Sequence, residues 1–190
     1  MKIERTHVGW GFWFWWVLAS TVGWAVGNAA GMKVVQAVVR AAEPMAKGLV
    51  VGLALAVVMT GAAVGVMQWL VLRREVSGAG WWMLASIVGW VVGTAAATLG
   101  ILLVGLQKFS PVSSSIVIGV VVGAVAGVMQ WLILRRQLRR TGWWVLASTV
   151  GWAVGAAATG AIGLPAVGAV SGAITGIALV RLLRQPIAEA

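Results

Sequence analysis

The chain has 190 residues, of which 61% are hydrophobic and 9% charged, with a formal net charge of +10 and a mean hydropathy of +0.99. Soluble domains carry about 25% charged residues, so the composition excludes an ordinary soluble domain and predicts that lipid surrounds most of the protein. Asp and Cys are absent and the four Glu residues lie outside the apolar runs, which argues against an enzyme, a metal site or a disulfide.

Six apolar runs follow one another, and each approaches the roughly 20 residues that a membrane-spanning helix needs. In chain order, the predicted spans are 10–32, 48–72, 81–106, 116–134, 143–164 and 166–183. The third and fifth spans begin with a Trp-Trp pair, and the second and fourth end in an Arg-Arg pair. Spans and connectors therefore alternate in a regular pattern.

A repeat underlies this pattern. Residues 61–93 return almost unchanged at 123–155, and half of the unit, WWVLASTVGWAVG, occurs at 15–27. We interpret residues 1–190 as one transmembrane domain of three tandem hairpins, at about 10–75, 76–137 and 138–185. An even number of spans per repeat keeps every copy in the same orientation. The predicted fold is an all-α six-helix bundle with a pseudo-threefold axis along the membrane normal.

The basic residues predict that both termini are cytoplasmic, because short cytoplasmic loops retain an excess of Lys and Arg. On this topology the cytoplasmic side holds Lys2, Arg5, Arg73, Arg74, Arg135, Arg136, Arg139, Arg140, Arg181 and Arg184. The opposite side holds Lys33, Arg40, Lys47 and Lys108. We expect anionic lipid headgroups to contact the connector arginines, which are Arg73, Arg74, Arg135, Arg136, Arg139 and Arg140.

Glycines recur every four residues in most spans, as at Gly89 and Gly93, a spacing that predicts close helix packing, with a glycine-lined pore as the alternative. Three deep tryptophans lie beside these glycines and beside a serine on the same helix face. They are Trp24, Trp90 and Trp152, with Ser20, Ser86 and Ser148. Either they pack into the glycine grooves, or they form a wall for a pigment, quinone or lipid tail. We interpret the Trp-Trp pairs, with Trp69 and Trp131, as an aromatic belt at the membrane surface.

A few polar side chains lie inside the spans. Gln68 and Gln130 follow glycines at helical spacing, so we expect each amide to bond a neighbouring helix, through Ser86 or Ser148, or water from the cytoplasmic side. The third copy places Leu179 at the matching position. Asn28 has Thr94 and Ala156 as counterparts. These contacts favour structural stabilisation over a conduction or substrate site.

The strings QWLVLRR and WWVLASTVGWAVG, separated by a short connector, resemble repeats in uncharacterised multi-pass membrane proteins and membrane tails of bacteria, cyanobacteria especially. The resemblance weakens over residues 163–190. It implies a bacterial inner-membrane protein with repeated hairpins, with a thylakoid location as the alternative. It carries over no activity.

We therefore expect a non-enzymatic structural or accessory membrane protein without a cofactor, which packs through its glycine seams. Its partners would be lipids, other membrane proteins or further copies of itself, and not nucleic acid. One alternative is a passive channel lined by residues such as Gln68, Gln130 and Asn28. The other is a binder of an apolar cofactor or lipid between Trp24, Trp90 and Trp152.

Overall fold

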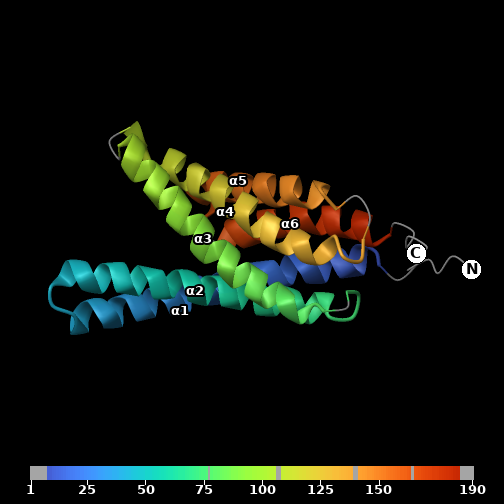
Figure 1. Cartoon of the computed structure of the whole chain (residues 1–190), viewed down its shortest axis with the longest axis horizontal. Helices are drawn as coiled ribbons and strands as arrows, with labels where there is room; N and C mark the ends of the chain where they lie inside the picture. Colours follow the sequence, from blue (N-terminus) through green and yellow to red (C-terminus); the bar gives the residue numbers. More distant parts are fainter. Residues whose placement is uncertain (1–7, 77, 106–107, 139–140, 164, 185–190) are drawn as a thin grey trace, which may run out of the picture.

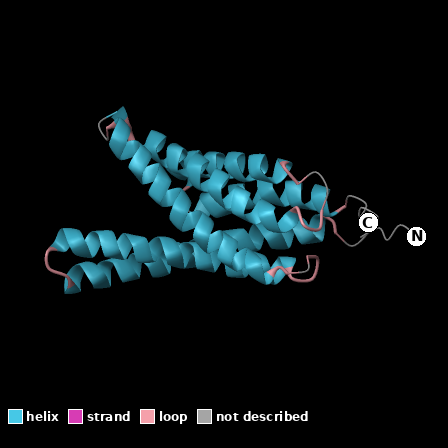
Figure 2. Ribbon diagram, in the orientation of Figure 1, coloured by secondary structure: helices cyan, strands magenta, loops and turns pink. Residues whose placement is uncertain are grey.

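Helices joined by short connections make up the computed structural model, which describes residues 8–76, 78–105, 108–138, 141–163 and 165–184 (Figures 1 and 2). The described part contains no strand. In chain order the helices are α1 (Trp10–Ala41), α2 (Met45–Leu72), α3 (Gly80–Val104), α4 (Pro111–Leu134), α5 (Trp143–Ile162) and α6 (Pro165–Leu183). The predicted span ends at residues 106 and 164 lie outside the described residues.

Proline, serine and glycine set several helix ends. Pro111 and Pro165 are the first residues of α4 and α6, a position where the missing N–H of proline costs nothing. The Ser110 side chain accepts a hydrogen bond from the Ser113 backbone N–H at 3.1 Å, which caps α4. Gly105 ends α3 at a φ of 103°, a conformation that strains any residue with a Cβ.

The first hairpin is longer than its sequence predicts. Helix α1 runs past residue 32 to Ala41, and only residues 42–44 separate it from α2. The added turns are helical because apolar packing continues along them: Val35 is buried, and a Cβ at Gly52 would lie 3.0 Å from the Val35 Cα. At 1.5 Å per residue the 32 residues of α1 extend over about 48 Å, more than the roughly 30 Å hydrocarbon core.

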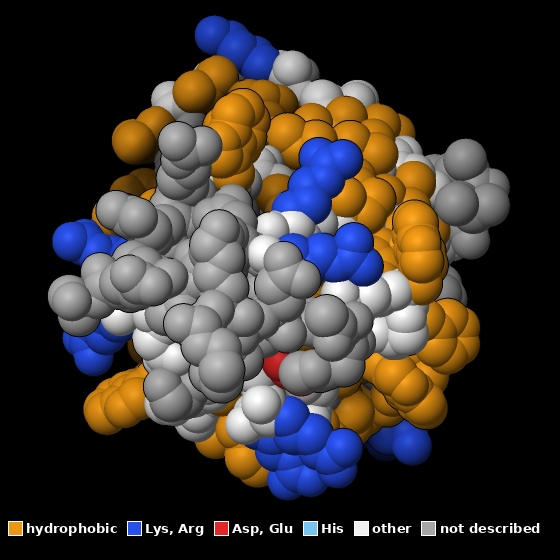
Figure 3. Space-filling model, turned by 90° about the vertical axis from the view of Figure 1, so that its right-hand side faces the viewer, with side chains coloured by type: hydrophobic (Ala, Val, Ile, Leu, Met, Phe, Trp, Pro, Cys, Tyr) orange, Lys and Arg blue, Asp and Glu red, His pale blue; other side chains and the backbone are white. Residues whose placement is uncertain are grey.

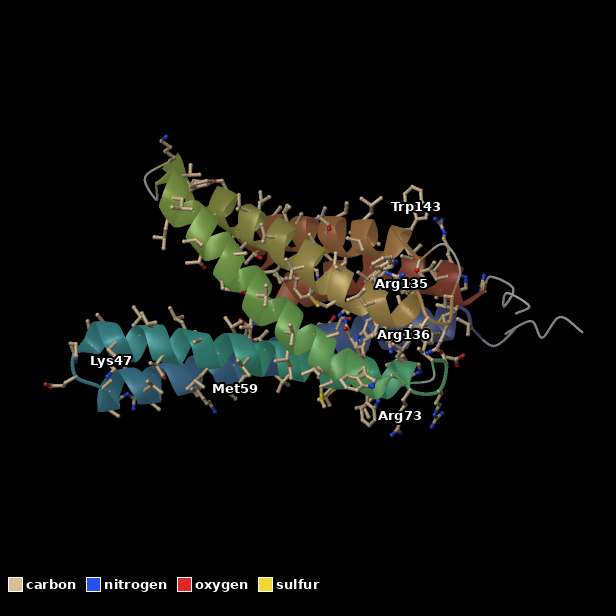
Figure 4. The ribbon with its side chains drawn as sticks, in the orientation of Figure 1. Lys47, Met59, Arg73, Arg135, Arg136 and Trp143 are labelled. Carbon is tan, nitrogen blue, oxygen red and sulfur yellow. The ribbon has the colours of Figure 1, made fainter. Side chains whose placement is uncertain are left out.

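The six helices form a closed ring. Each helix packs against the next in sequence, and α6 packs back against α1. At one end, here called the connector end, lie the α2–α3 and α4–α5 connections with Arg73, Arg135 and Arg136 (Figures 1 and 4). At the opposite, hairpin end lies the α1–α2 connection with Lys47 (Figure 4). The helices therefore alternate in direction around the ring.

Four helical segments are long and apolar enough to cross a membrane: α2, α3, α4 and Ala166–Leu183 of α6. The described part of the chain is thus all-α, and these four segments have the length and composition of membrane-spanning helices. Helix α1 is not among them, because it is rich in Trp, Ser and Thr and also holds Asn28 and Lys33, which lower its mean hydropathy. The side chains of α5 are described for residues 143–159 only, which is short of the roughly 20 residues of a span.

Glycine stripes form the contacts between helices all around the ring. Gly89 and Gly93 of α3 face α4, where an added Cβ would lie 2.5 and 2.8 Å from the Cα atoms of Ala126 and Val122. The other five interfaces have glycines against backbone or Cβ atoms in the same way. These glycines let the backbones approach closely. Because the neighbouring helix already fills the space beside them, they are not open to a second protein.

Candidate functional site

Three buried indoles meet at the centre of the ring, near the connector end. Trp16 of α1, Trp82 of α3 and Trp144 of α5 form the first tryptophan layer, with ring centroids 5.4 to 6.1 Å apart in edge-to-face geometry. Each side chain is 0–1% exposed. This separation is that of directly contacting aromatic rings, so the indoles fill the middle of the ring at this level.

The Trp-Trp pairs therefore divide between two environments, and the interpretation of both members as a surface belt is wrong for one of them. The first member is exposed in each pair, at 59%, 64% and 70% for Trp15, Trp81 and Trp143. Consecutive helical residues point about 100° apart. When the first indole faces outward, the second can therefore face the centre of the ring.

The two glutamines hold the first tryptophan layer in place. The Trp82 Nε1–H donates to Gln68 Oε1 at 3.0 Å, and the Trp144 Nε1–H donates to Gln130 Oε1 at 3.2 Å. Each amide also reaches a helix on its other side, because Gln68 Nε2 donates to Ser20 Oγ and Gln130 Nε2 donates to Ser86 Oγ, both at 3.1 Å. One glutamine thus connects three consecutive helices.

Ser86 shows how this network is satisfied within the protein. Its hydroxyl accepts from Gln130 and donates to the Trp82 backbone carbonyl at 2.8 Å. No buried side-chain N or O atom lacks a hydrogen-bond partner in the part of the chain that the structure describes. The glutamines are buried and bonded to protein, so the water contact considered as their alternative is not needed.

The third copy fills the glutamine position with Thr175 and not with Leu179. The Trp16 Nε1–H donates to Thr175 Oγ1 at 3.0 Å. Thr175 follows Gly172 by three residues, as Gln68 follows Gly65 and Gln130 follows Gly127. A Cβ on these three glycines would lie 2.8, 3.0 and 2.9 Å from the Cβ of Ser20, Ser86 and Ser148, respectively.

Leu179 instead corresponds to Leu72 and Leu134, and all three leucines are fully buried. Comparison of the sequences alone placed the third copy four residues out of register. Four residues are about one helical turn, so the wrong alignment still matched buried positions with buried positions.

The short Thr175 side chain donates to the Ser171 carbonyl of its own helix at 2.7 Å. Ser148, the counterpart of Ser20, is buried against Gly127.

At the α1–α6 interface, where the ring closes, the residue after Thr175 is also different from its counterpart in the first copy. Trp69 follows Gln68 in the first copy, whereas Gly176 follows Thr175 in the third. The space beside Gly176 is taken by Trp13 of α1: a Cβ at Gly176 would lie 2.9 Å from its Cδ1, and the Trp13 Nε1–H donates to the Ala173 carbonyl at 3.0 Å. The indole at the α1–α6 interface is therefore supplied by α1, because α6 has a glycine at this position.

Trp24, Trp90 and Trp152 form the second tryptophan layer, eight residues further along the same helices. Their centroids lie 4.8 to 5.5 Å apart, and Trp90 and Trp152 are buried. The rings contact one another directly, which leaves no space between them for a planar cofactor. Asn28, one turn beyond Trp24, donates to the Trp24 carbonyl at 3.0 Å, a bond within α1.

Three grooves at corresponding positions open on the outer surface of the described ring, each at the connector end of a helix pair. Groove A lies between α1 and α2, groove B between α3 and α4, and groove C between α5 and α6, with volumes of about 520, 580 and 570 Å³. Each is lined by an exposed tryptophan and an arginine at corresponding positions. The pairs are Trp15 with Arg74, Trp81 with Arg136, and Trp143 with Arg181.

Arg73 and Arg135 do not line these grooves. The guanidinium carbons of Arg73 and Arg135 lie 5.4 and 4.6 Å from the ring centroids of Trp69 and Trp131, within the range of cation–π contacts. Arg139 and Arg140, also predicted to contact headgroups, lie outside the described residues. Figure 3 looks onto the connector end and shows several basic side chains there, with hydrophobic side chains between them.

Comparison with known proteins gives no further guide, since no family model, curated protein or solved structure matches the chain.

Proposed function

We propose that the chain is a non-enzymatic integral membrane protein whose sealed ring of six spanning helices acts as a structural or accessory element beside other membrane components. The observation that carries this proposal is the pair of tryptophan layers. Trp16, Trp82 and Trp144 at one level, and Trp24, Trp90 and Trp152 at the next, occupy the centre of the ring, where a channel would need open space.

The same layers support six spans. Helix α3 is apolar and long enough to cross a membrane. Trp82 of α3 contacts both Trp16 of α1 and Trp144 of α5, so the three helices share one depth. Helices α1 and α5 lie at the same level as α3 and belong to the same closed ring, so we propose that they span the membrane as well. The matched positions of the three copies favour an approximate threefold axis along the bilayer normal.

The charges favour a cytoplasmic connector end. Its described residues include six arginines, which are Arg73, Arg74, Arg135, Arg136, Arg181 and Arg184. The hairpin end has four basic residues, Lys33, Arg40, Lys47 and Lys108. A basic excess on one side orients membrane proteins with that side in the cytoplasm. We place the protein in a bacterial inner membrane on the sequence resemblance alone.

Flux through liposomes tests the sealed ring. We expect proteoliposomes containing the purified chain to release an entrapped ion or small dye no faster than protein-free liposomes, with a channel-forming peptide as the positive control. Reconstitution is verified separately by resistance of the protein to alkaline extraction. Flux above the protein-free rate that scales with the amount of inserted protein would show that the indole layers do not seal the ring.

Photocrosslinking tests the accessory role. A photoreactive residue at Leu103, which is 79% exposed on α3, should crosslink reproducibly to one defined membrane partner or to a second copy of the chain. The same residue at Ala97, which is 2% exposed on α3, is the matched control and should not. If Leu103 and other exposed positions crosslink to lipid alone, and the chain is monomeric in mild detergent, the accessory role is wrong.

A further inference from the structure

Grooves A, B and C have the same construction in the three helix pairs. Their walls are two half-exposed apolar side chains that face each other from the two helices: Leu18 and Leu70 in groove A, Leu84 and Leu132 in groove B, and Leu146 and Ile177 in groove C. Volumes of 520 to 580 Å³ lie within the range of small-molecule sites, about 300 to 1,000 Å³. Such walls suit an acyl chain and give a free inorganic anion nothing to contact.

The connector end of each groove has the chemistry of a phospholipid headgroup site. Arg74, Arg136 and Arg181 are exposed at the groove edge, and a guanidinium binds phosphate oxygens with two parallel hydrogen bonds. The exposed tryptophan beside each arginine has an apolar ring and a polar N–H, the combination found at the boundary between acyl chains and headgroups. The apolar and phosphate-binding parts are therefore adjacent and in the right order along the helix.

One position differs among the grooves. The residue after the arginine is Glu75 in groove A, Gln137 in groove B and Leu182 in groove C, and each lines its groove. The Glu75 carboxylate adds a negative charge to the lining of groove A beside Arg74, so the net charge of this lining is lower than in grooves B and C. Grooves B and C have no acidic residue among their described lining residues, so their arginines keep their full attraction for a lipid with net negative charge.

We propose that grooves B and C are binding sites for anionic phospholipids, with an acyl chain between the two helices and the phosphate on Arg136 or Arg181, and that groove A accepts lipids without preferring a negative headgroup. This inference rests on the proposed membrane location of the ring. A zwitterionic headgroup brings its own cation close to the guanidinium, and this explains the preference for net negative charge.

Native mass spectrometry of the full chain, mixed with phosphatidylglycerol and phosphatidylcholine at equal concentration in mild detergent, tests the proposal. We expect two bound phosphatidylglycerol molecules in preference to phosphatidylcholine. Arg136→Gln and Arg181→Gln should each weaken one of these sites about fivefold. Arg135→Gln is the matched control, because Arg135 stacks on Trp131 outside the groove. Glu75→Gln should add a third selective site in groove A.

The outcomes separate the two proposals. Equal retention of both lipids, or a loss of phosphatidylglycerol in Arg135→Gln as large as in Arg136→Gln, would overturn the groove assignment while leaving the membrane ring in place. A chain that binds neither lipid and is removed from membranes by alkaline extraction would overturn the proposed function itself.

Discussion

Replacement of Gln68 by leucine gives the most direct test of the core network. Leucine is close in size but can neither accept from Trp82 nor donate to Ser20. The variant loses hydrogen bonds of 3.0 and 3.1 Å, and it leaves the N–H of a tryptophan that is 0% exposed without its acceptor. Interhelical hydrogen bonds in membrane proteins contribute about 0.6 kcal/mol each on average and up to about 1.7. We therefore expect a loss of about 1 to 3 kcal/mol.

The assay is reversible unfolding in mixed micelles of mild detergent and increasing dodecyl sulfate, followed by helical circular dichroism. Gln36→Leu is the matched control, because Gln36 is exposed on α1, and its unfolding free energy should stay within about 0.5 kcal/mol of the parent protein. Adding Trp82→Phe to Gln68→Leu removes the unsatisfied donor. The two changes should therefore be less than additive, with a coupling of about 0.5 to 2 kcal/mol.

An unfolding free energy for Gln68→Leu equal to that of Gln36→Leu would refute the reasoning, as would strict additivity with Trp82→Phe. Either result would mean that the amide does not bond the indole. Liposome flux in the same variants separates structure from conduction, because a structural glutamine can be replaced without opening or closing any path. A change in ion flux on Gln68→Leu would instead favour a wet pathway.

Gly89→Ala should destabilise the protein by about 1 to 3 kcal/mol in the same titration, because its Cβ would lie 2.5 Å from the Ala126 Cα. Gly100→Ala, on the same helix with no atom within 4 Å of the new Cβ, should stabilise it by about 0.5 to 1 kcal/mol, and shifts of the same sign in both variants would contradict the packing described here. Thr175→Val removes the acceptor of the Trp16 N–H at nearly constant shape, and we expect a loss of about 1 to 3 kcal/mol. Thr175→Ser keeps the hydroxyl as the control, and equal losses in both Thr175 variants would contradict the assigned bond.

The sequence was sufficient for the local part of this structure. Long apolar runs predicted the helices, and proline and glycine marked most of the breaks between them, because backbone conformation near these residues is decided locally. Glycines at four-residue spacing, such as Gly89 and Gly93, indicated close packing, because residues four apart share a helix face and glycine lets a neighbouring backbone approach. The extent of α1 beyond residue 32 was missed, because its basic residues resemble those of a loop.

Contacts that close over long sequence separations could not be predicted in the same way. The Trp-Trp pattern indicates that an aromatic residue is placed regularly, but it does not say which member of the pair meets two others at the centre. That choice depends on how three distant helices are rotated relative to one another. Sequence comparison missed Thr175 because threonine and glutamine are dissimilar residues. A hydroxyl oxygen and an amide oxygen can nevertheless accept the same hydrogen bond.

Trp13 at the α1–α6 interface opposes domain swapping between the similar hairpins. Nearly identical hairpins could in principle replace one another, within one chain or between two chains during synthesis, and build tangled oligomers. Trp13 opposite Gly176 fits only where the first helix meets the last. If another hairpin took the place of the third, Trp69 or Trp131 would stand where Gly176 is and would clash with Trp13. This pairing therefore specifies that α6 is the helix that closes the ring against α1.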